Sequence, residues 1–349
     1  MIEIKREGFT AKISEPELYV DNKSRGRSGH MTHAMAEFAP GKLIDFNSNC
    51  TAVKFNGHST FGWIEYRISE DGGETFSDVY ELPYSKEALY DGIYVISVEK
   101  AVACDDGRIV AICLRNNADA LCQPWDTPMT VTSFDGGKTW TKEKELCEYK
   151  GRVYDALYHN GVIYVLEFCN DGTGWFCGEK EEHLYRIFTS HDNGETFEEL
   201  CVVPVPTMGR AYGAMVIDHE ENLHVYAYNA NDEEHIDHVI SKDFGKTWEE
   251  ATLSFVKDGL RNPQITQIDG VFIAHGRNAQ RTGFVLYTSK DGQNWDDGSY
   301  IGNATGVCYY SNNIVLKDKD GKNRLLIQYS ENYGQGSCVN IKHAWLTIE

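Results

Sequence analysis

One short pattern recurs along this chain and limits the folds that it can adopt. Residues 133–140 read Ser, Phe, Asp, Gly, Gly, Lys, Thr, Trp, and three more segments keep the order Ser, Asp, Gly, Thr, aromatic. Those segments begin at Ser69, Ser190 and Ser241, and a shortened copy begins at Ser289. Each follows an alternating apolar run, which predicts a hairpin tip where Asp accepts backbone hydrogen bonds and Gly supplies a positive φ.

A second repeat, independent of the first, predicts the number of sheets. Six times, an alternating apolar run meets a tight polar turn and then another apolar run. The six turns are Pro40-Gly41, Asp106-Gly107, Asn160-Gly161, Glu221-Asn222, Asp269-Gly270 and Asp320-Gly321. A hairpin with the first pattern lies between most of them, so each pair of hairpins is predicted to form one four-stranded blade. Six such turns predict six blades.

Residues 1–349 are therefore predicted to form a single all-β domain, a six-bladed β-propeller. The sixth blade lacks the first pattern. We expect residues 337–348 to supply its third strand and residues 9–20 its fourth, which would close the ring by joining the two chain ends. The 20 Tyr, 15 Phe and 7 Trp suit a β-rich fold, and no helix of consequence is predicted.

Charge and cysteine usage restrict the partners. A net charge of −20 argues against nucleic acid or an anionic membrane as a partner, although local arginines can still bind an anionic sugar. No apolar leader or membrane-spanning run is present, and the ten cysteines include no C-x-x-C pair. These features predict reduced thiols, no metal or other cofactor, and a cytoplasmic location, or a secreted one if a signal peptide has been removed.

The eight-residue pattern is the Asp-box, and the chain resembles the Asp-box β-propellers, whose best-known members are the sialidases. The resemblance implies an exo-acting glycoside hydrolase of a terminal, acidic sugar. In Tyr310-Ser311, which precedes an apolar strand, it implies the nucleophile of a retaining mechanism. A phenol suits this substrate because an ionised carboxylate would be repelled by it. The Asp-box aspartates themselves are expected to be structural.

The ends of the six innermost hairpins are expected to converge at one mouth of the ring, and they are rich in Arg, His, Tyr and carboxylates. Asp155 is the first choice for the acid/base, with pairing to an arginine as its alternative. Glu99, Glu167 or Glu331 would activate Tyr310. The candidate catalytic residues are Tyr310, Asp155, Glu99 and His33, and the candidate substrate-binding residues are Arg210, Tyr212, Arg261, Arg277, Arg281, Arg115, Glu167, Tyr154 and His30.

The chain departs from the sialidase pattern in two blades. The first-blade Arg-Ile-Pro is absent, and His30 and His33 stand there instead. In the fourth blade, Arg210 and Tyr228 occupy the places of the family's glutamate and arginine. A His and a Tyr with arginines also suit β-elimination from a uronic acid, because arginine neutralises the carboxylate while His or Tyr moves the proton. A uronate lyase is therefore one alternative, and a non-catalytic glycan-binding propeller is another.

Overall fold

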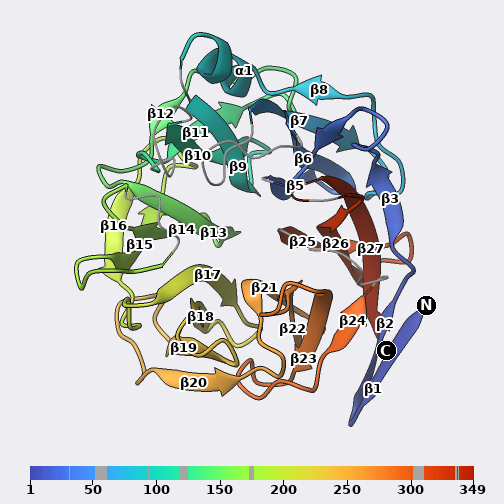
Figure 1. Ribbon diagram of the computed structural model, residues 1–349, viewed down its shortest axis with the longest axis vertical. Coiled ribbons are helices and arrows are strands. Elements are labelled where there is room, and N and C mark those ends of the chain that lie inside the picture. Colours follow the sequence, from blue (N-terminus) through green and yellow to red (C-terminus); the bar gives the residue numbers. More distant parts are fainter. Residues whose placement is uncertain are drawn as a thin grey trace.

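The computed structural model is a ring of six antiparallel sheets around a common axis, seen along that axis in Figure 1. The structure describes residues 1–30, 32–51, 61–92, 94–117, 125–172, 177–301, 310–334, 336 and 338–349. In the first five blades the four main strands follow one another outward in chain order, so that the first strand faces the axis. In the sixth blade three strands do so, and N-terminal strands lie outside them. The six-bladed propeller predicted from the two repeats is confirmed.

The strands have equivalent places in the six blades. The innermost strands are β5 (His33–Ala39), β9 (Tyr94–Ala103), β13 (Gly151–His159), β17 (Arg210–Ile217), β21 (Arg261–Ile268) and β25 (Ser311–Lys317). The second strands are β6 (Lys42–Thr51), β10 (Ile109–Asn117), β14 (Val162–Cys169), β18 (Leu223–Asn229), β22 (Val271–Arg277) and β26 (Asn323–Asn332). The third strands are β7 (Gly62–Ser69), β11 (Met129–Ser133), β15 (Leu184–Ser190), β19 (His235–Ser241), β23 (Phe284–Ser289) and β27 (Val339–Ile348). The outer strands of the first five blades are β8 (Tyr80–Glu81), β12 (Lys144–Glu145), β16 (Glu198–Val202), β20 (Thr252–Phe255) and β24 (Ser299–Ile301).

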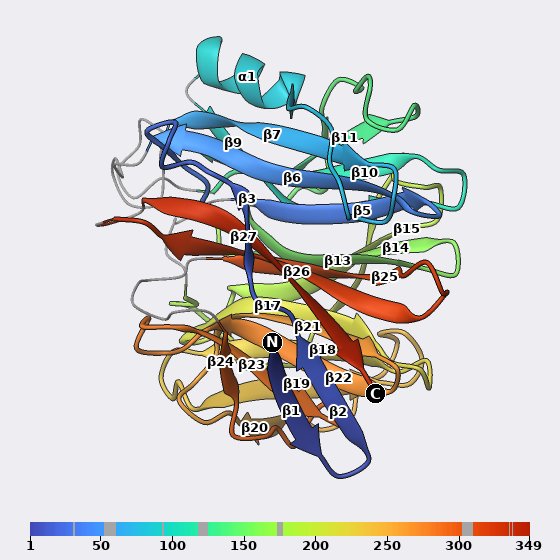
Figure 2. The same cartoon turned by 90° about the vertical axis from the view of Figure 1, so that its right-hand side faces the viewer.

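The two chain ends close the ring in the sixth blade, as predicted. Two N-terminal strands, β2 (Phe9–Ile13) and β3 (Glu17–Val20), pair with β27 near the C-terminus. Thr10 and Glu349 exchange two backbone hydrogen bonds of 2.7 and 2.9 Å, and Figure 2 shows the two termini on the same side of the molecule. The short strands β1 (Ile2–Arg6) and β4 (Arg27–Ser28) pair with β2 and β6.

The Asp-box hairpins join the third strand of a blade to its outer strand, away from the axis. In the second blade, Asp135 accepts hydrogen bonds from the backbone N–H of Thr139 at 2.9 Å and from its hydroxyl at 2.7 Å. Ser133 donates to Asp135 and accepts from the N–H of Gly137. Gly137 has φ +89°, and a Cβ there would lie 3.0 Å from Ile44 of the first blade. The Asp-box therefore shapes the turn and lets one blade pack closely on the next.

One short helix, α1 (Pro83–Tyr90), lies at the periphery after β8, where no helix was predicted. It spans eight residues and its N-cap, Leu82, makes no side-chain capping hydrogen bond. Pro83 at the first helical position is a start signal, but the sequence offers no capping side chain beside it. Leu82 and Ser85 are fully buried, and Ser85 Oγ accepts a 2.9 Å hydrogen bond from the N–H of Ile64, so tertiary contacts hold the helix in place.

Candidate active site

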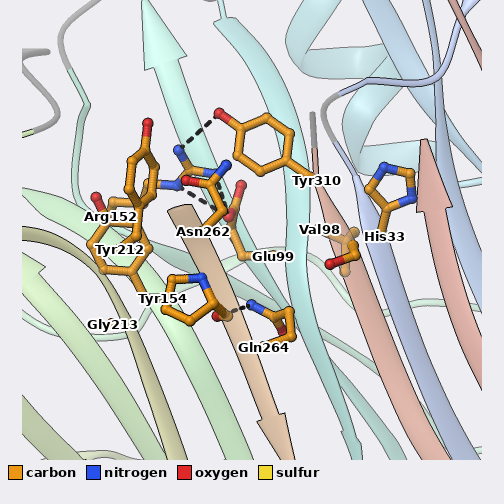
Figure 3. A pocket seen from close by; sticks show the side chains of 12 residues that line it. His33, Val98, Glu99, Arg152, Tyr154, Tyr212, Gly213, Asn262, Gln264 and Tyr310 are labelled. Atoms are coloured by element: carbon orange, nitrogen blue, oxygen red, sulfur yellow. Dashed lines mark hydrogen bonds and ion pairs between the residues drawn. The ribbon is translucent and has the colours of Figure 1, made fainter. Parts of the chain in front are cut away.

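A pocket with an empty volume of about 400 Å³ opens near the axis, where the innermost strands begin. We call it the axial pocket (Figure 3). All six blades contribute to it. The lining residues are His33, Val98, Glu99, Arg152, Tyr154, Tyr212, Gly213, Asn262, Pro263, Gln264, Tyr310 and Ser311.

Backbone irregularities direct four of these side chains into the pocket. The innermost strands β9, β13, β17 and β21 each shift register against their partner strand near the mouth. The extra residues at these β-bulges are Glu99, Tyr154, Tyr212 and Asn262, all of which line the axial pocket. Tyr212 and Asn262 have left-handed backbones, with φ of +43° and +56°. Since a bulge re-aims the side chain that it carries, these irregularities build the site.

Three side chains from different blades form the polar centre of the pocket. Arg152 donates to Glu99 Oε2 through Nε at 3.1 Å and through an η-nitrogen at 2.9 Å. Its other η-nitrogen lies 3.5 Å from the hydroxyl of Tyr310, and its guanidinium carbon lies 5.0 Å from the centre of the Tyr310 ring. Burial raises the pKa of Glu99, while the charge of Arg152 opposes that rise. The carboxyl, guanidinium and phenol thus form one connected group (Figure 3).

His33 lies across the pocket from Arg152 in Figure 3. Its Nδ1 is 2.9 Å from Oε1 of Gln328, and its Nε2 has no hydrogen-bond partner among the described residues. The side chain is buried, and this burial lowers the pKa of His33 to about 4, although the hydrogen bond to Gln328 opposes the shift. His33 is therefore neutral near pH 7.

Two further arginines lie close to the tyrosines of the pocket. The guanidinium carbon of Arg277 is 6.0 Å from the ring centre of Tyr310. Arg261 faces Arg277 in the register of β21 and β22, and its guanidinium carbon is 5.6 Å from the ring centre of Tyr212. Both arginines are about 6% exposed. Three guanidinium groups therefore border the tyrosines, but Arg152 is the one that lines the axial pocket itself.

Asp155, our first choice for the acid/base, lies outside the axial pocket. Its carboxylate forms a 3.0 Å ion pair with Lys100 and accepts a 2.8 Å hydrogen bond from the N–H of Met215. Lys100 also donates to Gln264 and Asn312, so the pair belongs to a buried network of several blades. The physical reason is the bulge at Tyr154, because it shifts the alternation by one residue. Asp155 thus faces a second pocket, with Met215.

Five other candidates also lie outside the lining of the axial pocket. Arg210 pairs with Asp237 at 2.8 Å, and Arg115 pairs with Asp126 at 2.9 Å. Arg281 is exposed in a turn, with φ +60°. The remaining two are Glu167 and His30. Of the residues proposed from sequence, the structure brings together Tyr310, Glu99, His33, Tyr154 and Tyr212 in the pocket, while Tyr309, next to Tyr310, lies outside the described residues.

Glu167 and His30 are buried in their own blades. Glu167 accepts a 3.1 Å hydrogen bond from the thiol of Cys147, and burial raises the pKa of Glu167 to about 7. His30 Nδ1 lies 3.2 Å from the hydroxyl of Ser28. Neither side chain lines the axial pocket, and Glu331, the third candidate base, pairs with Lys342 at 2.7 Å.

Sequence reasoning missed Arg152 and Gln264. Arg152 lies two residues before Tyr154 on β13, so strand alternation from a recognised pocket tyrosine would have found it. Gln264 follows the bulge of β21, and no sequence signal marks that bulge beyond Pro263, which is disfavoured inside a regular sheet.

Several negative observations apply to the described part of the chain. No group of three or more His, Cys, Asp or Glu side chains there is arranged to hold a metal ion. The eight cysteines within it form no disulfide with one another. None of its helices combines the length and apolar character that crossing a bilayer requires.

Comparisons with known proteins agree with this architecture. Residues 131–142 match the model of the BNR/Asp-box repeat. A search of curated protein sequences found no match. A protein of unknown function from Dyadobacter fermentans is structurally similar, with a TM-score of 0.71 and 15% identity over 97% of this chain and 99% of that one.

Sialidases are also among the similar structures. A mutant of the NanB sialidase of Streptococcus pneumoniae has a TM-score of 0.68 and 11% identity over 95% of this chain and 70% of its own. Trypanosoma rangeli sialidase has a TM-score of 0.67 and 15% identity, and this chain covers 59% of its length. The trypanosomal enzyme has been solved as a covalent intermediate with 2,3-difluorosialic acid. At these identities the likeness concerns the fold: this chain is an Asp-box β-propeller with the six-bladed fold of the sialidases.

Proposed function

We propose that this protein is an exo-acting glycoside hydrolase of a terminal acidic sugar, with Tyr310 as its nucleophile. The observation that carries the proposal is the contact of Tyr310 with Arg152, and of Arg152 with Glu99, in the axial pocket. Without such charged neighbours, a tyrosine at the mouth of a propeller would be expected only to form hydrogen bonds. A guanidinium and a carboxylate beside it supply the charge stabilisation and the proton acceptor that a phenolic nucleophile needs.

The chemistry follows from the charges of the three groups. Arg152 stabilises the negative charge that develops on the phenolic oxygen as Glu99 takes its proton. That oxygen then bonds to the anomeric carbon while the bond from this carbon to the leaving-group oxygen breaks, and the proton held by Glu99 passes to the leaving oxygen. Glu99 is the proton acceptor in this scheme, since its Oε1 has no hydrogen-bond partner among the described residues. Attack by Tyr310 and later attack by water would each invert the anomeric centre, so the configuration is retained overall.

An acidic substrate is supported by the local excess of arginine in a chain whose net charge is −20. Arg152, Arg261 and Arg277 all lie beside the pocket tyrosines. Arg277 lies beside the ring of the proposed nucleophile, so we infer that it binds the sugar carboxylate. The covalent intermediate of the trypanosomal sialidase supports the same class of substrate by analogy of fold.

A second candidate, β-elimination from a uronic acid, is favoured by one observation. His33 is neutral, its Nε2 has no hydrogen-bond partner within the described part of the chain, and it lines the axial pocket with Tyr310 and Arg152. This arrangement suits removal of the C5 proton by His33 while Tyr310 protonates the leaving oxygen. The absence of Asp155 from the pocket also removes the acid that we first assigned to hydrolysis.

Covalent trapping and product analysis test the proposal. We expect 2,3-difluorosialic acid or a fluorinated uronyl fluoride to inactivate the protein and to add one sugar mass to the peptide that contains Tyr310. Tyr310→Phe should abolish labelling and turnover. Tyr185→Phe is the matched control, since that hydroxyl also has no hydrogen-bond partner among the described residues and its side chain does not line the axial pocket. It should keep most of the activity.

The reaction products distinguish the candidate functions. A hydrolase releases a free sugar of retained configuration, whereas a lyase releases a product with the ultraviolet absorbance of an unsaturated uronate. If Tyr310→Phe turns over as fast as the wild type, the nucleophile assignment is wrong. Binding of acidic glycans with neither product would identify a non-catalytic propeller.

A further inference from the structure

A chain of buried side chains runs from the axial pocket to the seam between the first and sixth blades. It begins at His33 on β5, passes through Gln328 on β26 and Asp45 on β6, and ends at His343 on β27. His33 Nδ1 lies 2.9 Å from Gln328 Oε1, Gln328 Nε2 donates to Asp45 Oδ1, and His343 Nε2 lies 3.0 Å from Asp45 Oδ2. Gln328 and Asp45 are both 0% exposed.

The chemistry of these side chains determines which atom donates and which accepts in each hydrogen bond of the series. A carboxylate accepts hydrogen bonds and donates none, so the amide nitrogen of Gln328 must face Asp45. The amide oxygen then faces His33 and can accept, which requires a hydrogen on Nδ1 of the imidazole. A neutral imidazole carries a hydrogen on only one of its two ring nitrogens. With Nδ1 protonated, Nε2 of His33 therefore has a lone pair and no hydrogen.

The ring nitrogen that carries this lone pair belongs to a residue of the axial pocket. Nε2 is buried, has no hydrogen-bond partner among the described residues, and belongs to a side chain that lines the axial pocket with Tyr310. The nearby charged and titratable groups are His343 behind it and the Glu99–Arg152 pair and Tyr310 across the pocket. Burial keeps the imidazole neutral because it lowers the pKa of His33 to about 4.

We propose that Gln328 and Asp45 are positioning residues that hold His33 in the Nδ1–H tautomer, with Nε2 as the proton acceptor of the axial pocket. The catalytic step rests on the proposed function. In that step a water oxygen bonds to the anomeric carbon, and the bond from this carbon to the Tyr310 oxygen breaks with its electron pair on that oxygen. The water proton passes to Nε2 of His33 and afterwards to the phenolate.

Nitrogen NMR of the full-length protein labelled with ¹⁵N-histidine tests the tautomer without any substrate. The His33→Gln variant assigns the signals. Near neutral pH we expect a protonated Nδ1 and an unprotonated Nε2 for His33. A protonated Nε2 in the wild-type protein would overturn the proposal, and this result does not depend on any variant folding.

Two variants test the positioning residues. Gln328→Met and Asp45→Asn should each convert His33 to a mixture of tautomers, and each should slow release of the sugar from Tyr310 more than its transfer to Tyr310. Asn313→Met is the matched control, since this amide of the sixth blade bonds His275 instead. It should leave the His33 signals unchanged. An unaltered His33 tautomer in both variants would exclude a positioning role.

Kinetics then separate this inference from the proposed function. With an acidic glycoside that has a chromogenic leaving group, His33→Gln should give a burst of product followed by a steady rate reduced by about 100-fold, a common size for a lost general base. The Nδ1–H tautomer without turnover of any acidic glycoside would count against the proposed function. Rapid turnover by His33→Gln would overturn the catalytic step assigned to Nε2.

Discussion

Arg152 makes two contacts with one guanidinium group, so a substitution of this residue cannot separate its effect on stability from its effect on activity. It pairs with Glu99, where both side chains are buried, and it contacts the Tyr310 hydroxyl. Removing one partner of a buried ion pair typically costs roughly 3–5 kcal/mol because the other charge is left without compensation. An Arg152 truncation would therefore lower stability and activity together. Tyr310→Phe removes one oxygen and leaves the ion pair intact, so it is the more informative variant.

Arg277 and Arg281 form a natural pair of variants for testing the carboxylate clamp. Arg277 is buried beside the Tyr310 ring, whereas Arg281 is exposed in the following turn. Since a charge-assisted hydrogen bond contributes roughly 1.5–3 kcal/mol, Arg277→Ala should weaken binding of an acidic sugar by about tenfold or more. Arg281→Asn should leave binding unchanged, because asparagine tolerates the positive φ of that position.

Titration calorimetry with sialic acid and glucuronic acid measures this difference. Circular dichroism of both variants checks that they are folded. Equal affinity of Arg277→Ala and the wild-type protein for both sugars would contradict the assignment of Arg277 to the substrate carboxylate.

At the scale of strands and hairpins, the Asp-box is predicted to stabilise the blade and to leave the chemistry alone. Asp192 accepts two hydrogen bonds from Thr196 and one from Ser190, and these bonds, opposed by burial, hold the pKa of Asp192 at about 2. Asp192→Ala should lower the melting temperature by roughly 2–6 °C with kcat/KM unchanged. His191→Ala, at an exposed position in the same hairpin, is the control. A loss of activity in folded Asp192→Ala would contradict a purely structural role.

The same elements explain which parts of the structure were predictable. The hairpins, their turns and the Asp-boxes follow from local alternation and turn chemistry, so six blades could be counted from residues such as Gly107 and Gly137. The bulges could not, because an extra residue in a strand depends on contacts with the neighbouring blades and leaves the local composition unchanged. The bulge at Tyr154, for example, turns Asp155 toward a second pocket, which the sequence alone does not indicate.

At the scale of the whole molecule, the site and the closure of the ring depend on the same residues. The lining of the axial pocket comes from all six blades, and the hydrogen-bonded chain behind His33 crosses the seam where the first and last blades meet. The predicted ring therefore already implied that distant residues converge. It did not identify Gln328 and Asp45, since buried polar pairs across a seam leave no periodic signal in either strand.

Buried histidines should make the whole propeller sensitive to mild acid. Burial lowers the pKa of His33 to about 4, and those of His238 and His275 to about 3. In the unfolded chain these groups titrate near pH 6.5. Above that pH both states are neutral and the histidines have no effect. As the pH falls below about 6.5, the unfolded chain binds protons that the folded protein excludes, so the free energy of unfolding decreases until the folded pKa values are reached.

Urea denaturation between about pH 7 and pH 4 measures the slope of the free energy of unfolding against pH. His275→Gln should reduce it by close to one proton, because one excluded protonation is removed. A slope that is the same in His275→Gln and the wild-type protein would show that His275 takes up its proton equally well in the folded state.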